Sequence, residues 1–328
     1  MKFRTEIQIN KPGLFIEHFN SIATFGSCFA ENIAEYLIRF RFNILNNPFG
    51  ILYNPVSIFN ALSLISSGKA FIKNDLVQHD DLWHSWYHHG SFSHPDAEEC
   101  LAGINKQLQT TKQFMNSCNY LIITYGTAYV FEHLESGTIV SNCHKIPSNY
   151  FKRFRLSIKE IESNVSETIE LVKSINPAIK IIFSVSPVRH LKDGMVDNQL
   201  SKSALILALH NAIKDENSCF YFPSYEIMMD DLRDYRFYDS NLTHPNQLAI
   251  NYIWDKFSNT WLSEECILII KDMEKLNQAR AHRSLFPGSK KEKEFKQRQI
   301  EQLGKLKTKY PHIDFSEDIK YFSLDNPN

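Results

Sequence analysis

The sequence lacks the features that direct a chain toward nucleic acid or a membrane. Its 328 residues carry 36 basic and 37 acidic side chains, which leaves a net charge near −1. Without an excess of positive charge, no overall electrostatic field attracts nucleic acid or an anionic bilayer. No apolar run reaches the roughly 18 residues that a bilayer-spanning helix needs. We therefore expect neither nucleic acid nor a membrane among the partners.

Paired cysteines are also missing. The six cysteines stand apart along the chain, with no Cys-x-x-Cys pair: Cys28, Cys100, Cys118, Cys143, Cys219 and Cys266. In a chain of this length such a distribution indicates reduced thiols rather than a disulfide framework. The first nine residues alternate between polar and apolar, unlike the apolar core of a signal peptide. On these grounds we expect a cytoplasmic protein.

What is present is the composition of a globular protein, 43% hydrophobic and 22% charged. Short apolar strands are predicted over 22–25, 119–124, 179–185 and 219–222. Amphipathic helices are predicted over 29–40, 157–175 and 201–213, with another beginning at Pro245. Apolar strands that alternate with amphipathic helices are typical of a mostly parallel sheet covered by helices on both faces.

Two segments depart from this α/β pattern. Residues 68–118 are irregular and rich in His, Trp and Ser, and we interpret them as an insertion or lid near the site. From residue 263 onward the chain is highly charged, with a mixed-charge helix predicted over 290–299. Because Glu is interspersed with Lys there, a solvated helix is favoured over a basic nucleic-acid arm. The predicted domains are thus 1–262 and a charged helical extension, 263–328.

Several polar residues follow the predicted strands, at the edge where open α/β sheets bind ligands. They are Gly26, Ser27 and Cys28 after the first strand, Gly126 and Thr127 after the second, and Ser186, Arg189 and His190 after the third. His244 precedes the last predicted helix. A serine and a histidine brought to one edge provide the hydroxyl nucleophile and the proton acceptor that acyl transfer requires.

Ser27 has two interpretations. It begins a predicted helix, where a serine commonly serves as the N-cap. It also stands where a nucleophile at the end of a strand would lie, beside backbone N–H groups able to hold an oxyanion. Cys28 is the alternative nucleophile, because a thiol at a helix N-terminus can be acidified. Burial of a small apolar side chain is the simpler role for Cys28.

The motif Gly26-Ser27-Cys28-Phe29-Ala30 and several others resemble the GSCFA family, a branch of the SGNH (GDSL-like) hydrolase superfamily. The other matching motifs run in order between about residues 20 and 260: Asn47-Pro48-Phe49-Gly50, Tyr125-Gly126-Thr127-Ala128, Asn142-Cys143-His144-Lys145, Ser186-Pro187-Val188-Arg189-His190, Asp231-Leu232-Arg233-Asp234-Tyr235-Arg236-Phe237-Tyr238 and His244-Pro245. The resemblance implies a three-layer α/β/α sandwich and ester hydrolysis by Ser27 with His244. It also implies that the Ser27 and Gly50 N–H groups form the oxyanion hole.

Two departures from the superfamily pattern affect these roles. An Asn normally stands two residues after the glycine of the third motif, but here Gly126 is followed by Thr127 and Ala128. Asn142, or Thr127, is the candidate replacement donor for the oxyanion. The Asp expected three residues before His244 is Asn241, whose carbonyl can accept from the imidazole but adds no charge. Asp239 is the alternative partner of His244.

The remaining candidates concern substrate and metal. His84 and His88 have the i,i+4 spacing that binds zinc on a helix, but without the Glu of a His-Glu-x-x-His motif. Packing or substrate contact is favoured, and no metal is predicted. Arg189, with its neighbour His190, would clamp an anionic substrate group or pair with Asp231 or Asp234. The predicted substrate-binding set is Thr127, His144, Arg189, His190 and His84.

The sequence as a whole predicts a serine esterase or deacylase that needs no cofactor. Its substrate would be an acyl ester of a small molecule or a carbohydrate. Two alternatives stay open on the same fold. One is acyl transfer to a sugar or another alcohol, and the other is a ligand-binding protein without catalysis.

Overall fold

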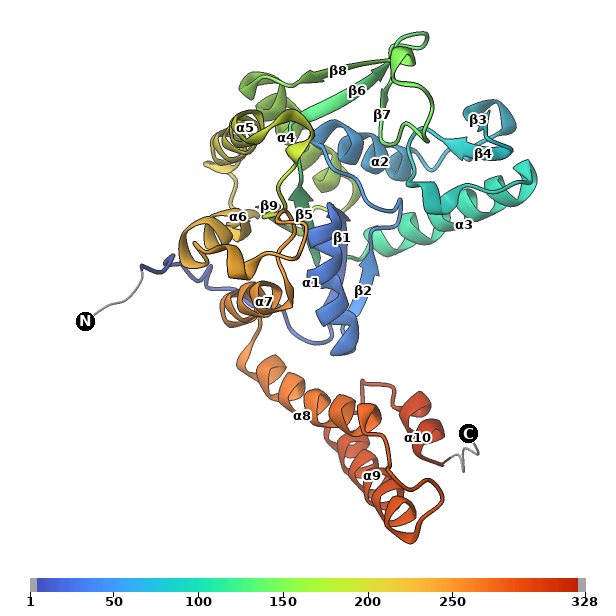
Figure 1. Ribbon diagram of the computed structural model, residues 1–328, viewed down its shortest axis with the longest axis vertical. Coiled ribbons are helices and arrows are strands. Elements are labelled where there is room, and N and C mark those ends of the chain that lie inside the picture. The colour runs from blue at the N-terminus through green and yellow to red at the C-terminus, as the bar shows by residue number, and fades with distance from the viewer. Residues whose placement is uncertain (1–4, 324–328) are drawn as a thin grey trace.

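A five-stranded parallel sheet forms the centre of the protein in the computed structural model, which describes residues 5–323 (Figure 1). Its order is β10 (Cys219–Phe222), β9 (Lys180–Val185), β5 (Tyr120–Tyr125), β1 (Ser21–Gly26) and β2 (Asn43–Asn46). Neighbouring strands are parallel throughout. Every residue of β1 and β5 is buried, as expected for apolar strands covered on both faces.

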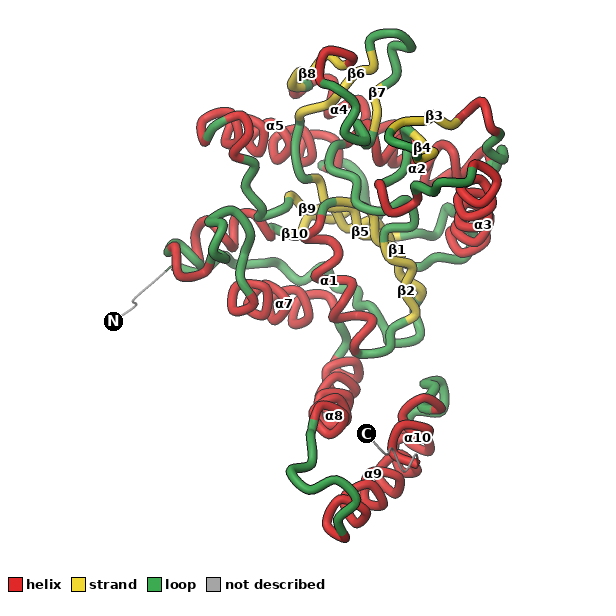
Figure 2. Tube along the Cα trace, turned by 45° about the vertical axis from the view of Figure 1, so that its right-hand side comes forward, coloured by secondary structure: helices red, strands yellow, loops and turns green. Residues whose placement is uncertain are grey.

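Helices cover both faces of this sheet, so the predicted three-layer α/β/α sandwich is confirmed (Figure 2). One face packs against α1 (Cys28–Arg39) and α7 (Gln247–Trp261). The other packs against α2 (Pro55–Ser67), α4 (Ile158–Ile175) and α5 (Met195–Ile213). Successive side chains of each strand enter opposite layers, because side chains alternate across a sheet.

Local sequence signals explain where these helices begin. Ser157 and Glu160 form a capping box at the start of α4. The Asn54 side chain caps α2, which begins at a proline. Asn246 caps α7, so Pro245 lies just before the helix rather than at its first position. The predicted boundary there was wrong by two residues, because a side-chain acceptor was available after the proline.

The segment 68–118 has more regular structure than its composition indicates. It contains an antiparallel hairpin of β3 (Leu76–His79) and β4 (Leu82–Ser85), followed by the long helix α3 (Ala97–Met115). His84 lies on β4, so the helical geometry required for a His84–His88 zinc pair is absent.

A second small sheet was not predicted at all. It is antiparallel and consists of β6 (Tyr129–His133), β7 (Ile139–Val140) and β8 (Phe151–Arg155). Shorter elements complete the fold: α6 (Ser224–Glu226), the π-helical turn η5 (Ile227–Asp231), and the 3-10 turns η1 (Lys73–Asp75), η2 (Gly90–Phe92), η3 (Ser148–Tyr150), η4 (Leu191–Asp193) and η6 (Tyr235–Phe237).

The C-terminal helices extend away from the sandwich, on the side of α1 and α7 (Figures 1 and 2). They are α8 (Glu264–Ala281), α9 (Lys290–Lys309) and α10 (Ser316–Ser323). The fully buried Asp318 of α10 pairs with Arg41 at 2.6 Å and with Arg280 at 2.9 Å. The predicted helical extension is thus present and anchored to the end of α1. Among the described residues, no helix is both long and apolar enough to cross a bilayer.

Candidate functional site

Ser27 lies in the tight connection between β1 and α1, and Gly26 makes this connection possible. A Cβ at Gly26 would lie 2.2 Å from the Thr124 carbonyl oxygen, and its φ of +147° disfavours other residues. The Gly26 N–H donates to Asn47 Oδ1 at 2.9 Å, and its carbonyl accepts from the Leu52 N–H at 3.0 Å. These contacts fix Ser27 at the carboxyl end of the sheet.

The Ser27 hydroxyl has no hydrogen-bond partner, although it is buried. Ser27 occupies the N-cap position of α1, yet its side chain makes no capping bond, and the residue is only 1% exposed. A buried polar group without a partner costs about 1–3 kcal/mol. The ordinary structural reason for a serine at this position is therefore not realised, and Oγ is free for another role.

The expected oxyanion donors are already engaged in this structure. The Ser27 N–H donates to the Thr124 carbonyl at 3.1 Å, and the Gly50 N–H donates to the Asn47 carbonyl at 2.7 Å. The Asn142 side-chain oxygen accepts the His144 N–H at 2.9 Å, and Asn142 lines the cavity beside His84 and His144 rather than the turn that carries Ser27. The two backbone N–H groups therefore do not form a preassembled oxyanion hole.

Thr127, the other candidate replacement donor, is also engaged. Its Oγ1 lies 3.2 Å from Ser201 Oγ and accepts the Tyr129 N–H at 3.1 Å. The N–H groups of Gly126 and Thr127 both donate to the Tyr53 carbonyl, at 2.7 and 3.0 Å. A Cβ at Gly126 would lie 3.4 Å from Ser27 Cβ, so this turn packs directly against the candidate nucleophile.

His244 is exposed and is held by Asn241 in the direction opposite to the one expected. Asn241 Oδ1 accepts three hydrogen bonds, from the Thr243 N–H, the Thr243 hydroxyl and the His244 N–H. Its amide nitrogen therefore faces His244 Nδ1, at 2.9 Å. An amide that donates to Nδ1 leaves the imidazole proton on Nε2. That tautomer presents no free lone pair to a serine.

Asp239 does not orient the imidazole in this structure. Its carboxylate accepts the Ser240 N–H at 2.7 Å, and its own N–H donates to the His244 carbonyl at 2.8 Å. No bond between the Asp239 carboxylate and the His244 ring occurs among the described residues.

His190 is a second histidine close to His244. The Arg189 N–H donates to the Thr243 carbonyl at 3.0 Å, which joins the loop after β9 to the loop that carries His244. The His190 ring lies edge-on to Tyr53, with centroids 5.8 Å apart, and its Nε2 is buried without a partner. Burial lowers the pKa of His190 to about 4, helped by the positive charges of Lys202 and His244. His190 is therefore neutral at pH 7.

Neither acidic partner expected for the Arg189 region is used. Asp231 accepts the Ile7 N–H at 2.7 Å and the Tyr252 hydroxyl at 2.9 Å. Asp234 accepts the Arg236 N–H at 2.9 Å. Arg189 instead lines a small cavity of about 210 Å³ together with Asp234 and Tyr238, and its guanidinium contacts the Tyr238 hydroxyl.

Lys202 is the residue whose burial the sequence did not signal. It is carried by α5 and is 0% exposed. Its ammonium donates to the Gly126 carbonyl at 2.6 Å and to the Ser186 carbonyl at 2.7 Å. The helical spacing predicted α5, but a lysine among polar neighbours is ordinarily exposed. The available clue was its place on the helix that follows the Ser186–His190 motif.

The surroundings of Cys28 do not activate its thiol. Burial raises the pKa of Cys28 above the ordinary thiol range, and the nearby carboxylate of Glu31 raises it further. A reactive cysteine requires the opposite shift, because the thiolate is the nucleophile. The environment therefore favours Ser27 over Cys28.

His84 and His144 belong to a different cavity. Their rings stack with centroids 4.4 Å apart, and they line a cavity of about 290 Å³ with Asn142 and Gly90. His144 Nε2 contacts the Ser85 carbonyl at 2.8 Å, and His84 contacts Ser93 Oγ and the His79 carbonyl. Within residues 5–323, no three His, Cys, Asp or Glu side chains are grouped to hold a metal ion.

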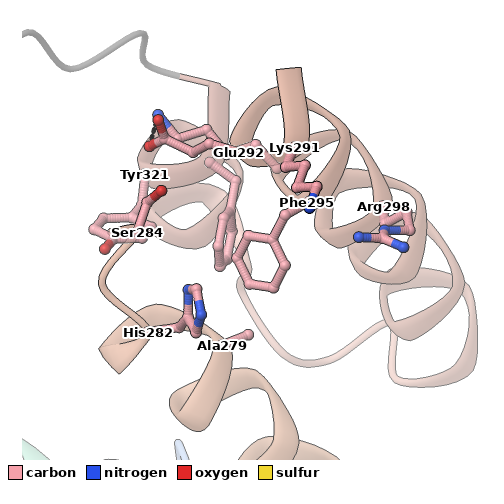
Figure 3. Close-up of a pocket in the computed structure, with 10 residues that line it drawn as sticks. Ala279, His282, Ser284, Lys291, Glu292, Phe295, Arg298 and Tyr321 are labelled. Carbon is pink, nitrogen blue, oxygen red and sulfur yellow. Dashed lines mark ion pairs between the residues drawn. The ribbon is translucent and has the colours of Figure 1, made fainter. Parts of the chain in front are cut away.

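Another cavity, of about 300 Å³, lies among the C-terminal helices (Figure 3). Aromatic and charged side chains line it, including His282, Phe295 and Tyr321. Figure 3 shows the Phe295 ring facing His282, and their centroids are 5.0 Å apart. All its lining residues lie between Ala279 and Phe322, so none comes from the strand edge that carries Ser27.

The fold and these residues define a parallel-sheet α/β/α protein with a candidate serine site at the end of its first strand. The chain belongs to the GSCFA family, whose model matches residues 21–257. Residues 273–324 match a separate model, the C-terminal domain of GSCFA domain proteins. No curated protein matches the sequence.

Solved structures of low similarity include two esterases. A carbohydrate esterase of family 3 from Talaromyces cellulolyticus is 8% identical with a TM-score of 0.35, over 77% of this chain and 99% of that chain. An acetyl xylan esterase from the rumen bacterium Butyrivibrio proteoclasticus is 11% identical with a TM-score of 0.33, over 76% of this chain and 66% of that one.

Proposed function

We propose that the protein is an SGNH-type serine esterase or deacylase with Ser27 as its nucleophile. One observation carries the proposal: the Ser27 hydroxyl is buried at the strand edge, has no partner and makes no capping bond. Leaving a buried hydroxyl unpaired costs stability, and a role in catalysis explains why the serine is kept there. The motif resemblance to SGNH hydrolases supports the same role.

In the proposed reaction, Ser27 Oγ bonds to the ester carbonyl carbon and gives its proton to His244 Nε2. The carbonyl π electrons move to the oxygen, which becomes the oxyanion. When the oxyanion collapses, the bond to the leaving alkoxide breaks, and the imidazolium of His244 protonates the departing alcohol. A water molecule then attacks the acyl-enzyme by the same steps and releases the acid and free Ser27. No cofactor takes part.

Two rearrangements must accompany substrate binding in this mechanism. Ser27 is 1% exposed and His244 is exposed, so the two side chains must meet as the site opens. The imidazole must also carry its proton on Nδ1, whereas Asn241 holds the other tautomer. The proposed substrate is an acyl ester of a small molecule or a carbohydrate, with Thr127, Arg189 and His190 near the reacting group.

The test is hydrolysis of p-nitrophenyl acetate together with labelling by a fluorophosphonate probe. We expect wild-type protein and Cys28→Ala to show both reactions, and Ser27→Ala to show neither. Mass spectrometry of the labelled peptide locates the adduct. Activity that survives in Ser27→Ala but disappears in Cys28→Ala would make this a thiol enzyme.

Non-catalytic ligand binding is the second candidate, and the engaged N–H groups of Ser27 and Gly50 favour it. Under this function, the wild-type protein is inert to both the ester and the fluorophosphonate. Acyl transfer to an alcohol is a third candidate, because it would use the same buried serine. Adding an alcohol acceptor would then divert the acyl group of the acyl-enzyme from water to the alcohol, so that a new ester forms in place of the free acid.

A further inference from the structure

The fully buried Lys202 connects two neighbouring strands of the sheet at their carboxyl ends. Its ammonium binds the carbonyl of Gly126, which follows β5, and that of Ser186, which follows β9. Lysine is almost never fully buried unless it is paired with an acid. Yet no carboxylate within residues 5–323 lies at ion-pair distance from Lys202.

The groups that face Lys202 leave its charge uncompensated. They come from each neighbouring element: Cys28 of α1, Arg189 and His190 after β9, and the ring of Tyr225 in α6, at 5.6 Å. Burial lowers the pKa of Lys202 to about 7. Holding two carbonyls requires only two donors, which a neutral amide also provides, so anchoring alone does not explain an ammonium here.

Ser27 lies on the other side of the turn that Lys202 holds. The Gly126 carbonyl accepts from Lys202, its N–H donates to the Tyr53 carbonyl, and a Cβ added at Gly126 would lie 3.4 Å from Ser27 Cβ. A single residue, Gly126, thus lies between the Lys202 ammonium and the candidate nucleophile. In this low-dielectric position its charge acts on the serine oxygen with little screening.

We propose that Lys202 is a positioning residue that supplies the positive potential for the oxyanion formed when Ser27 attacks the ester. It would do so in place of the side-chain amide that the Gly126-Thr127-Ala128 turn lacks. This inference rests on the proposed function. Because Lys202 is fully buried, it acts through the Gly126 turn and through space, without touching the substrate. The role requires the charged form, so turnover falls as the pH rises past the lysine pKa.

The stability of the Lys202 variants separates this role from a purely structural one. If Lys202 were only an anchor, removing its charge would destabilise the protein; if its buried charge is costly, removing it leaves stability unchanged or increases it. A lysine whose folded pKa is lowered binds fewer protons when folded than when unfolded. Between pH 7 and about 10.4, the ordinary lysine pKa, the folded state therefore gains stability as the pH rises. Below pH 7 the penalty for burying the charge is fully present, and removing the charge relieves it.

The experiment compares Lys202→Gln, which keeps amide donors without charge, with Lys202→Arg, which keeps a charge at every pH. Ser201→Ala is the matched control, because Ser201 holds the same turn through the Ala128 N–H at 2.8 Å but carries no charge. For each variant, kcat, KM, the pH profile of p-nitrophenyl acetate hydrolysis and the melting temperature are measured. The rate of fluorophosphonate labelling is followed in parallel.

We expect Lys202→Gln to lower kcat about 100-fold, as when one oxyanion stabiliser is removed. KM should stay unchanged, and the melting temperature should stay unchanged or rise. The decline of kcat above pH 7 should disappear. Ser201→Ala should keep that decline, and any activity left in Lys202→Arg should lack it. A Lys202→Gln protein that melts earlier, yet keeps the wild-type kcat and pH profile, would reduce Lys202 to a structural anchor.

Failure of the proposed function gives a different pattern. If the wild-type protein is labelled at Ser27 but hydrolyses no ester, the esterase proposal is wrong. The labelling rates of the variants then still test whether Lys202 supports the reactivity of Ser27. If Lys202→Gln is then labelled as fast as wild type, the inference is wrong. A wild-type protein inert in both assays overturns both proposals.

Discussion

Lysine behaves in opposite ways in the two main regions of the molecule. At the strand edge, burial lowers the pKa of Lys202 to about 7, and no acid accompanies it. In the C-terminal helices, the carboxylate of Asp272 and the Tyr310 hydroxyl raise the pKa of the exposed Lys309 above its ordinary value. Burial at the strand edge destabilises the charged form of Lys202, so its protonation changes near neutral pH. In the C-terminal helices, Asp272 stabilises the charged form of Lys309. The strand edge thus holds a buried lysine without an acid, whereas the C-terminal helices hold an exposed lysine paired with Asp272.

The strongest test of this division removes the hydroxyl at the strand edge. Ser27→Ala should lower kcat/KM for a short acyl ester by a factor on the order of 10⁴ or more, because no other nucleophile takes its place. Cys28→Ala, the adjacent residue, should keep most of the activity, since burial keeps its thiol protonated. Equal losses in the two variants would mean that the turn, rather than the hydroxyl, had been damaged.

Removal of the exposed histidine should have the next largest effect. His244→Ala is expected to reduce kcat by about 10³-fold, because the serine loses its proton acceptor. His94→Ala is the matched control, since the exposed His94 ring contacts the Asp96 backbone and the pairing of His94 with Trp83 uses backbone atoms alone. Steady-state kinetics at pH 7 measure both. Retention of wild-type turnover in His244→Ala would transfer the base role to another group, with buried His190 the first to examine.

Restoring a carboxylate beside His244 should increase activity. Asn241→Asp keeps the oxygen that accepts three hydrogen bonds and replaces the amide donor with an acceptor, which moves the imidazole proton to Nδ1. We expect turnover at pH 7 to rise by roughly tenfold or less, a small part of the 10⁴-fold effect known for such tautomer changes. Asp239→Ala should change turnover little. If it abolishes turnover while Asn241→Asp lowers it, Asp239 is the true partner.

A change at the junction with the C-terminal helices should affect stability and spare chemistry. Asp318→Ala leaves Arg41 and Arg280 without their shared partner. Since both arginines are partly exposed, we expect a loss of about 2 kcal/mol in the free energy of unfolding, less than for a fully buried pair. Urea unfolding measures this, and kcat at 25 °C should match wild type. A large drop in kcat would show that the extension supports the site.

The smallest expected effect is that of chelators. Ser-His chemistry uses no metal, and the histidines of the 84–94 segment are engaged in packing and backbone contacts. Incubation with EDTA should therefore leave hydrolysis unchanged. Loss of activity that zinc restores would contradict this expectation and direct attention to the cavity that His84 and His144 line.

The sequence predicted the central sheet because its strands are continuous apolar runs, and β5 and β9 were placed to within about one residue. It did not predict β2, which is an edge strand with polar ends, Asn43 and Asn46. The sheet of β6, β7 and β8 was missed because its residues alternate over a surface hairpin. A continuous apolar run identifies a fully buried strand, but a half-exposed strand has no such run and is hard to recognise from the sequence.

The sequence indicated which residues lie near the candidate site, but not which hydrogen bonds they make. The motifs located Ser27, Gly126, His190 and His244 near one edge, because carboxyl ends of parallel strands meet there. They could not reveal that Asn241 presents its nitrogen to His244, which depends on three donors that surround its oxygen. The full burial of Lys202 likewise depends on how α5 packs on the sheet.

The strand order carries one more consequence. From β1 the chain moves outward to β2 and then returns across the sheet to β5, β9 and β10, so the direction of winding reverses at β1. Helices α1 and α2, which follow β1 and β2, therefore lie on opposite faces of the sheet. Such a switch point is where open α/β sheets bind their ligands. Exchange of the loops that border it should alter which ester is accepted and leave the folding of the scaffold intact.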